Sequence, residues 1–454
     1  MFKHDSLLNA ARGKQIRLSV ATAGVASTLL LAGSGAWAQT STATGPVSLL
    51  FTIPVPVAAG NTTGGMYGFD ISWVDPTTQT YYLGDRSNAA VDAVNASTGS
   101  FIRQITATPP FAGVKLNGAG TAVNNNISGP NGVVTGVVSS GQNCLFAGDG
   151  NSRVVSFQLP SGSQAGGLST GGLFRADEMA FDPKDGILIV ANNADSPPFA
   201  TLIGVGAHCG MAIMKKINFA SATNGAEQPV WNPTTQRFYM SVPSISGTTA
   251  APGPTGAIAV INPLTGVVEK QFPINFCMPA GLALGPNQTF LAGCSVVYNT
   301  LGGVWSGSDT NTADPLQVII DTTGVYSYVS GIGSSDEVAY NSGDNHFYTG
   351  TSNSPYSAHP VASASGATST TDQAAAILGV IDGTSQNLDQ LVPTLNVPAV
   401  KPLLGPPPGH PGGSSHSVAV NSANNWVFVP HPANNVIPGC LQGCVGVYGR
   451  RTTN

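Results

Sequence analysis

The sequence predicts an all-β fold, namely a single β-propeller of about seven four-stranded blades. Two observations carry this prediction: one sequence pattern recurs seven times, and a spare strand precedes the first copy. Composition is a third observation, because the chain has 56 glycines and 33 prolines and is 42% hydrophobic but only 9% charged. Many short strands joined by Gly, Pro, Asn and Ser turns would have this mixture.

Each copy of the repeat has a polar residue, a short apolar strand, a turn such as Asn-Pro or Asp-Pro, and a second apolar strand. A third strand follows in several copies, and with an outer fourth strand it completes one propeller blade. A parallel β-helix would have a shorter repeat, and separate β-sandwich domains would not repeat one motif seven times. The clear copies span residues 177–192, 227–241, 336–350 and 416–430, and weaker copies begin at residues 70, 131 and 280.

The two ends of the mature chain provide the strands that close the ring. Residues 47–53 form a spare apolar strand, whereas the last copy ends at residues 444–449 with too little chain left for a fourth strand. We expect the N-terminal strand to complete the last blade, since this pairing removes an open sheet edge. The propeller domain is therefore predicted over residues 39–454.

The first 38 residues have the three parts of a Sec-type signal peptide. A basic leader is followed by the apolar run 18–32 and by the small residues of 33–38, so cleavage is expected after Ala38. A membrane anchor is the alternative, but a membrane span needs roughly 20 apolar residues. No second long apolar stretch follows. We therefore expect a secreted or periplasmic protein with no membrane contact after cleavage.

Charge and cysteine content narrow the partners and the compartment. The formal net charge is −5 and no Lys/Arg cluster follows the leader, so nucleic acid is not an expected partner. All six cysteines follow the cleavage site and predict up to three disulfides, with fifteen possible connectivities. Cys440 and Cys444 are the simplest pair because they lie close together. A redox or metal site is the alternative, but the Cys-x-x-Cys spacing is absent.

Two stretches of sequence resemble known families. The asparagine-rich first turns, and strands followed by Val-Ile-Asp/Asn-x-x-Thr-Gly, resemble YVTN-type and NHL-type bacterial β-propellers. Residues 226–232 are similar to the Glu-Gly-Pro-x-Trp motif of the gluconolactonase/senescence-marker family, although Gln228 stands where that family has Gly. The second resemblance implies a metal-dependent hydrolase in which Glu227 is a metal ligand. Asn192 and Asp149 are candidates for the remaining positions by their place in the repeat.

Aligning the copies places one residue of each at the start of the innermost strand, beside the central channel. Four of the 22 acidic residues fall in this column. Facing carboxylates raise one another's pKa and cost stability unless a cation compensates them. A divalent ion, Ca²⁺ or Mg²⁺, held by Asp70, Asp177 and Glu227 would meet that need. The column contains Asp70, Asn131, Asp177, Glu227, Ala280, Asp336 and His416.

Other interpretations of the column stay open. Polar residues at a channel mouth often cap turns or bind water. The adjacent column (Glu178, Gln228, Glu337 and Ser417) is an alternative set that would face the channel. Four histidines holding iron, as in carotenoid-oxygenase propellers, would need one His per contributing blade, and the column has only His416.

The remaining candidate residues follow from position. His416 and Asp336 are the candidate catalytic acid and base, because both belong to the column. Asp149, Asn192 and His431 lie where second strands end, and with Asn131 they are candidate ligand-binding residues; ordinary turn chemistry is the alternative for them.

These residues predict a monomeric, exported, metal-dependent enzyme that acts on a small molecule at the channel. A lactone or ester hydrolase, or a lyase, is the expected class. The alternative is a non-catalytic YVTN-type propeller whose loops bind a protein or carbohydrate partner. An oxidoreductase with quinone or copper is a third option that no residue pattern requires. A fold alone does not decide among these functions.

Overall fold

Short antiparallel strands make up almost all of the regular structure. The protein is described here from a computed structural model, in which residues 45–305, 316–354, 361–362, 368–369, 375–401, 403 and 409–451 are described. Ala43–Asn454 forms one compact unit. The predicted signal peptide, residues 1–38, lies outside the described residues. The prediction of an all-β fold is confirmed.

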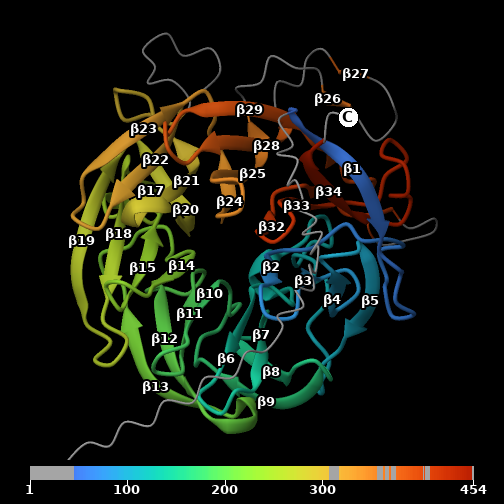
Figure 1. The fold of residues 1–454 in the computed structure, drawn as a ribbon, viewed down its shortest axis with the longest axis horizontal. Helices are drawn as coiled ribbons and strands as arrows, with labels where there is room; N and C mark the ends of the chain where they lie inside the picture. The colour runs from blue at the N-terminus through green and yellow to red at the C-terminus, as the bar shows by residue number, and fades with distance from the viewer. Residues whose placement is uncertain are drawn as a thin grey trace, which may run out of the picture. The chain divides into compact units, whose positions relative to one another are not determined.

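Five sheets have four strands each. In Figure 1 the first strand of each sheet lies nearest the centre of the view, except that β32 takes this place in the sheet that contains β1. From the centre outward, the first two sheets are β2(Ser72–Asp75), β3(Thr80–Asp85), β4(Ala90–Asn95) and β5(Ser100–Ile105), and β6(Val133–Val137), β7(Asn143–Asp149), β8(Arg153–Gln158) and β9(Ser163–Ser169). The third sheet is β10(Met179–Asp182), β11(Ile187–Asn192), β12(Phe199–Val205) and β13(Met211–Asn218). The last two are β24(Ser335–Asn341), β25(His346–Ser354), β28(Ala375–Asp382) and β29(Leu388–Pro393), and β32(Ala419–Asn421), β33(Trp426–His431), β34(Cys444–Arg450) and β1(Val47–Pro54).

A sixth, eight-stranded sheet divides into two four-stranded groups that a single parallel pair, Thr255 with Cys277, joins. The short elements are the hairpins β16–β17, β26–β27 and β30–β31 and three 3₁₀ turns. The two groups are β14(Pro229–Asn232), β15(Arg237–Val242), β18(Thr255–Ile261) and β19(Val268–Asn275), and β20(Cys277–Leu284), β21(Thr289–Val297), β22(Leu316–Asp321) and β23(Tyr326–Ser330); the short elements are β16(Gly247–Thr248), β17(Ala251–Pro252), β26(Val361–Ala362), β27(Thr368–Ser369), β30(Asn396–Val397), β31(Gly413–Ser414), η1(Asn125–Ile127), η2(Ala207–Cys209) and η3(Pro286–Gln288).

The Asp or Asn at the end of the first strand makes the turn into the second strand. Asp75 accepts hydrogen bonds from the backbone N–H groups of Thr77 and Thr78. Asn232 accepts the equivalent bonds from Thr234 and Thr235. Such side chains hold a turn by bonding the backbone two or three residues on. This is why the repeat has Asp-Pro or Asn-Pro at this point.

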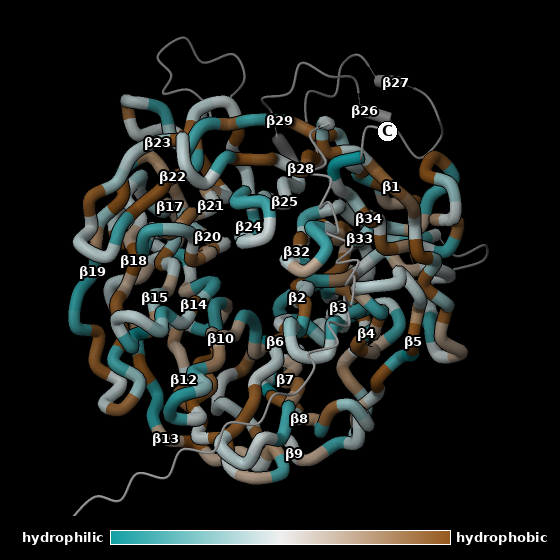
Figure 2. Tube along the Cα trace, viewed as in Figure 1, coloured by the Kyte–Doolittle hydropathy of each residue, from teal (hydrophilic) through white to brown (hydrophobic). Residues whose placement is uncertain are grey.

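The core lies between neighbouring sheets. Aromatic rings stack from one sheet to the next, as Phe146 of β7 does on Phe181 of β10 at 5.7 Å. Outer strands alternate or remain exposed, and β13 has five consecutive exposed residues. Figure 2 shows this contrast between the hydrophobic strand β28 and the hydrophilic stretches of β13. Burying each large apolar side chain contributes roughly 1.5–3 kcal/mol.

The first described strand pairs with the last. In β1, Val47 lies opposite Arg450 of β34 and Pro54 lies opposite Cys444. The backbone N–H of Val47 also donates to the side chain of Gln390, in β29 of the preceding sheet, at 2.8 Å. The predicted pairing of the N-terminal strand with the last copy is therefore present.

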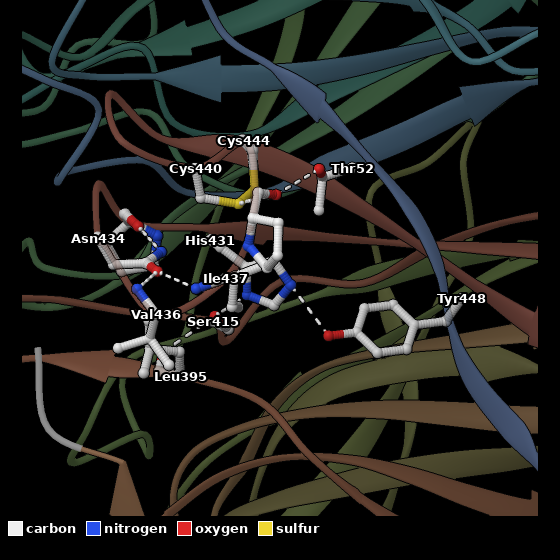
Figure 3. Close-up of a disulfide and its surroundings, with 12 residues drawn as sticks. Thr52, Leu395, Ser415, His431, Asn434, Val436, Ile437, Cys440, Cys444 and Tyr448 are labelled. Carbon is white, nitrogen blue, oxygen red and sulfur yellow. Dashed lines mark hydrogen bonds between the residues drawn. A yellow bond between two sulfur atoms is a disulfide. The ribbon is translucent and has the colours of Figure 1, made fainter. Parts of the chain in front are cut away.

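Three disulfides join the six cysteines. Cys440–Cys444 confirms the predicted pair and lies beside β1 and β33 (Figure 3). Disulfides of this kind indicate a compartment outside the reducing cytoplasm. None of the helices in the described part of the chain is long and apolar enough to cross a membrane. The other two pairs, which the sequence left open, are Cys144–Cys209 and Cys277–Cys294.

Candidate functional site at the channel mouth

Two adjoining cavities lie where the first strands of the sheets face one another. The mouth cavity, of about 300 Å³, is mainly polar and is lined by five residues of the predicted column. The inner cavity, of about 700 Å³, is lined by the innermost strands β2, β6, β10, β14, β20, β24 and β32. These strands carry the labels that surround the centre of Figure 1. The column residues at the mouth cavity are Asp70, Asp177, Glu227, Asp336 and His416.

Repeated backbone geometry brings the column residues to this position. In four of the groups the column residue donates its backbone N–H to the second strand, at the same point of the sheet. This equivalence agrees with the alignment of the sequence copies. The four bonds run from Asp70 to Gly84, from Asn131 to Gly148, from Asp177 to Ala191 and from Glu227 to Ser241, at 2.8–2.9 Å.

Two arginines lie among the carboxylates. Arg86 forms an ion pair with Asp70 and donates to Oδ1 of Asn131 at 2.9 Å. Arg175 places Nε 2.8 Å from Asp177 and Nη1 3.6 Å from Asp70. The two guanidinium groups therefore connect three neighbouring members of the column. They provide the positive charge that compensates its carboxylates, a role predicted from the sequence for a metal ion.

Asp70 also faces His416, whose Nε2 lies 3.6 Å from Oδ1 of the carboxylate. Nδ1 of His416 is 2.9 Å from the carbonyl of Ser414 and therefore carries a proton, and Phe69 stacks on the ring. Burial lowers the pKa of His416, but the charges of Asp70 and Asp336 outweigh burial and raise it. Burial raises the pKa of Asp70, but Arg86, His416 and Arg175 together outweigh burial and hold this pKa below the ordinary range. The pair favours an imidazolium beside a carboxylate.

Glu227 is a carboxyl group of the mouth cavity that forms no ion pair within 4 Å in the described structure. It accepts from Nδ2 of Asn193 at 3.1 and 3.2 Å. Burial raises the pKa of Glu227 to about 7, with Arg175 opposing the shift and Asp336 adding to it. This carboxyl group therefore exchanges a proton near neutral pH.

Glu178 and Glu337 belong to the adjacent column, and they line both cavities. Each is only 4% exposed. Burial raises both pKa values well above normal, with the charge of Glu337 adding to the shift of Glu178 and the charge of Asp336 adding to that of Glu337. The side chains of this column therefore reach the channel as well, so the two columns do not exclude one another.

None of the four predicted ligand-binding residues lines either cavity in the described structure; these residues are Asn131, Asp149, Asn192 and His431. Asp149 pairs with Arg153 at 2.7 Å. Asn192 donates to the backbone carbonyl of Arg175 at 3.0 Å and so helps to position that arginine. Their role in binding stays a prediction.

His431 is fully buried in β33. Its ring nitrogens contact the hydroxyls of Ser415 at 2.7 Å and Tyr448 at 3.0 Å, as Figure 3 shows. Burial lowers its pKa to about 3, so the ring is neutral. These contacts are those of a core histidine, and its predicted contact with a ligand stays a prediction.

The contacts of Asp70, Asp177 and Glu227 bear on the predicted metal. Within the described residues, no group of three or more His, Cys, Asp or Glu side chains is arranged to hold a metal ion. Asp70 and Asp177 instead form ion pairs with arginines. The arrangement fits ion pairing better than ligation by these three residues, and a Ca²⁺ or Mg²⁺ ion stays a prediction.

Sequence reasoning missed Arg86 and Arg175. A signal was present, because Lys and Arg together number only 17 in the chain. Arg175 stands two residues before Asp177 in the column, and Arg86 directly follows the second strand of its copy. A rare charge next to a repeated carboxylate is a reason to expect pairing between them.

Four-stranded antiparallel sheets around a polar mouth and a central cavity define a β-propeller-like fold. The chain is similar to a solved structure of hydrazine synthase from Kuenenia stuttgartiensis, with a TM-score of 0.57 and 12% identity over 88% of this chain and 99% of that chain. At this identity the likeness concerns the fold alone. No family model and no curated protein matches the sequence. These comparisons give no support to the YVTN-type or gluconolactonase resemblance.

Proposed function

We propose that the protein is an exported seven-bladed propeller enzyme that acts on a small molecule by general acid–base chemistry. The reaction class is hydrolysis of an ester or lactone, or a lyase reaction that needs the same groups. The observation that carries this proposal is the mouth cavity, where His416, with its raised pKa, lies together with Glu227, whose pKa of about 7 lets it accept a proton near neutral pH.

Seven blades in a closed ring are the architecture that this proposal uses. In support, each innermost strand contacts the next in the order β2, β6, β10, β14, β20, β24 and β32, and β32 contacts β2. The pairing of β1 with β34 would then seal the last blade. A channel through the ring places side chains of several blades around one substrate.

The groups at the mouth have complementary roles in hydrolysis. Glu227 takes a proton from water as the water oxygen bonds to the acyl carbon, and the carbonyl electrons move to the oxygen. Arg175 or Arg86 stabilises this oxyanion. When the acyl–oxygen bond breaks, the imidazolium of His416 gives its proton to the leaving alkoxide, and the proton on Glu227 returns His416 to its starting state through solvent. Asp336 and Asp70 stabilise the imidazolium.

The test measures hydrolysis of aryl esters and of γ- and δ-lactones by residues 39–454. Changing His416→Gln should lower kcat/KM about 100-fold or more, since general acid–base groups contribute about 10²–10⁴-fold. The control is His208→Gln, because His208 is exposed on the 3₁₀ turn η2. Circular dichroism checks that both variants fold.

Three results would contradict the proposal: no turnover by the wild type, equal activity in His416→Gln, or loss of activity with a stoichiometric metal removed by chelator. The last result would restore the metal-dependent mechanism. Ligand binding without turnover would favour a non-catalytic binding propeller.

A further inference from the structure

Two glutamates lie at the junction where the polar mouth cavity meets the mainly apolar inner cavity. Glu178, directly before β10, and Glu337, in β24, line both the mouth cavity and the inner cavity. Both side chains are nearly buried. In the described structure, Oε2 of Glu178 accepts no hydrogen bond from an N–H or hydroxyl group, and its carboxyl group lies within hydrogen-bonding reach of that of Glu337. A buried carboxyl oxygen without a donor costs free energy that a ligand with N–H groups would recover.

The charges around the mouth cavity favour a cation. Six carboxyl groups and only two guanidinium groups line it. Burial and the charge of neighbouring carboxylates raise the pKa values of Glu178 and Glu337, so a cation that binds between them can take the place of the protons that they hold. Arg86 and Arg175 form their ion pairs with Asp70 and Asp177. The described residues show no ion pair between an arginine or lysine and Glu178 or Glu337, so these two carboxyl groups are the ones that lack a cationic partner.

The inner cavity favours an apolar body. Trp73, Trp231, Tyr340 and Phe181 line it together with aliphatic residues of the innermost strands. Its volume of about 700 Å³ is within the range of small-molecule pockets. Exposed residues such as Pro76 and Pro183, from the turns that follow β2 and β10, also line it. A ligand can therefore enter at the end away from the mouth.

We propose that the substrate is a hydrophobic amine, with its ammonium group at the Glu178–Glu337 junction and its apolar body in the inner cavity. This inference rests on the proposed function, in which the reacting bond lies in the mouth cavity. An ammonium group has three N–H donors and one positive charge, so it bonds both carboxylates. An alcohol cannot neutralise the pair, and an anion is repelled by it.

The experiment compares four probes of matched or shortened chain: n-octylammonium, n-octanol, n-octanoate and ethylammonium. Calorimetry measures Kd, and tryptophan fluorescence reports on Trp73 and Trp231. We expect n-octylammonium to bind at least tenfold more tightly than n-octanol and ethylammonium, and n-octanoate not to bind. Equal affinity for n-octylammonium and n-octanol, or for n-octylammonium and ethylammonium, would overturn the inference.

A pair of variants locates the ammonium group. The double change Glu178→Gln and Glu337→Gln keeps the shape and removes both charges, and should raise the Kd of n-octylammonium at least tenfold. The control is Glu269→Gln, on the outer strand β19, where the carboxylate pairs with Arg237 at the surface. An unchanged Kd in the double variant would overturn the inference, and circular dichroism verifies folding.

The inference and the proposed function fail separately. His416→Gln should retain n-octylammonium binding although it loses turnover. A protein that binds n-octylammonium as described but hydrolyses nothing would lose the proposed reaction and keep the binding site. A protein that hydrolyses esters without binding or inhibition by n-octylammonium would keep the reaction and lose this substrate class.

Discussion

Arg175 connects parts of the chain that lie far apart in sequence. Its guanidinium contacts Asp177 and Asp70, and its backbone carbonyl accepts a hydrogen bond from Asn192. Burial lowers the pKa of Arg175, but the charges of Asp177 and Asp70 outweigh it, so this side chain stays charged. Arg175 therefore compensates the carboxylates of two different sheets.

Replacing Arg175→Met should reduce the free energy of unfolding by about 3–5 kcal/mol, because the change leaves buried carboxylates without their partner. The control is Arg237→Met, whose ion pair with Glu269 is about one-third exposed and contributes about 0–1 kcal/mol. Urea unfolding at pH 7 measures both. Equal effects would mean that the buried ion pairs do not stabilise the mouth.

A second buried carboxyl pair lies outside the mouth, between β3 and β4. Asp92 is fully buried, and its carboxyl group lies within hydrogen-bonding reach of that of Asp85. Burial and the charge of Asp85 raise the pKa of Asp92 well above normal, and burial raises that of Asp85 to about 6. The folded protein therefore holds protons here that the unfolded chain releases.

This proton uptake sets the direction of a pH effect. Since the folded state binds these protons more tightly, stability falls as pH rises from about 4, the pKa of an unfolded Asp, through the value of about 6 for Asp85. Asp92→Asn should raise the free energy of unfolding at pH 8 by about 1–3 kcal/mol, at about 1.4 kcal/mol per pKa unit. Thermal unfolding from pH 5 to 8 should show a flatter slope than in the wild type, with the exposed-turn variant Asp185→Asn as control. A steeper slope in Asp92→Asn would contradict this interpretation.

At the residue scale, the column was predictable because repetition marks equivalent positions. Asp70, Asp177 and Glu227 occupy equivalent positions, and the backbone bonds show why. The partners of these residues were not predictable in the same way, since Arg86 and Arg175 are outside the repeated pattern. The negative charge of the column is compensated by contacts between sheets, such as that of Arg175 with Asp70. The sequence of a single repeat does not reveal contacts with another repeat.

At the scale of single elements, the strands and turns followed closely from sequence. The third strands predicted to follow in several copies are present, for example as β4 after the first copy and β8 after the second. Periodicity did not reveal the parallel pair of Thr255 with Cys277, which joins two groups into one sheet. That pair forms where β18 and β20 meet side by side, and it depends on packing rather than on either strand's pattern.

The strand β1 provides the test at this scale. A protein that begins at residue 55 lacks β1 and should fail to unfold cooperatively or should aggregate, because β34 then has an open edge. A protein that begins at residue 45 retains β1 and is the control. Size-exclusion chromatography and thermal unfolding compare them. Equal stability of the two proteins would show that β1 is not needed to complete the last sheet.

At the scale of the whole molecule, Cys144–Cys209 links the sheet of β7 to the turn η2 that follows β12 in the next sheet. The two cysteines are 65 residues apart, against 17 for Cys277–Cys294 and 4 for Cys440–Cys444. In the chain-entropy model these loops correspond to about 4, 3 and 2 kcal/mol respectively.

Paired Cys→Ala changes should therefore destabilise the protein in that order, with Cys144 and Cys209 the most costly. Denaturant unfolding of the three double variants measures the order. If removal of Cys440–Cys444 costs the most, local packing around His431 and β1 contributes more than closure of the loop.

The pairing of β1 with β34 has a consequence for how the protein is made. Synthesis proceeds from the N-terminus, so the first described strand waits without its partner until Arg450 has been added. The pairing of β1 therefore forms only after residues 444–450 have been made, and a premature stop before residue 444 leaves the same unpaired edge as a missing N-terminal strand. The unpaired edge of this sheet is a feature by which proteases could distinguish incomplete chains from finished ones.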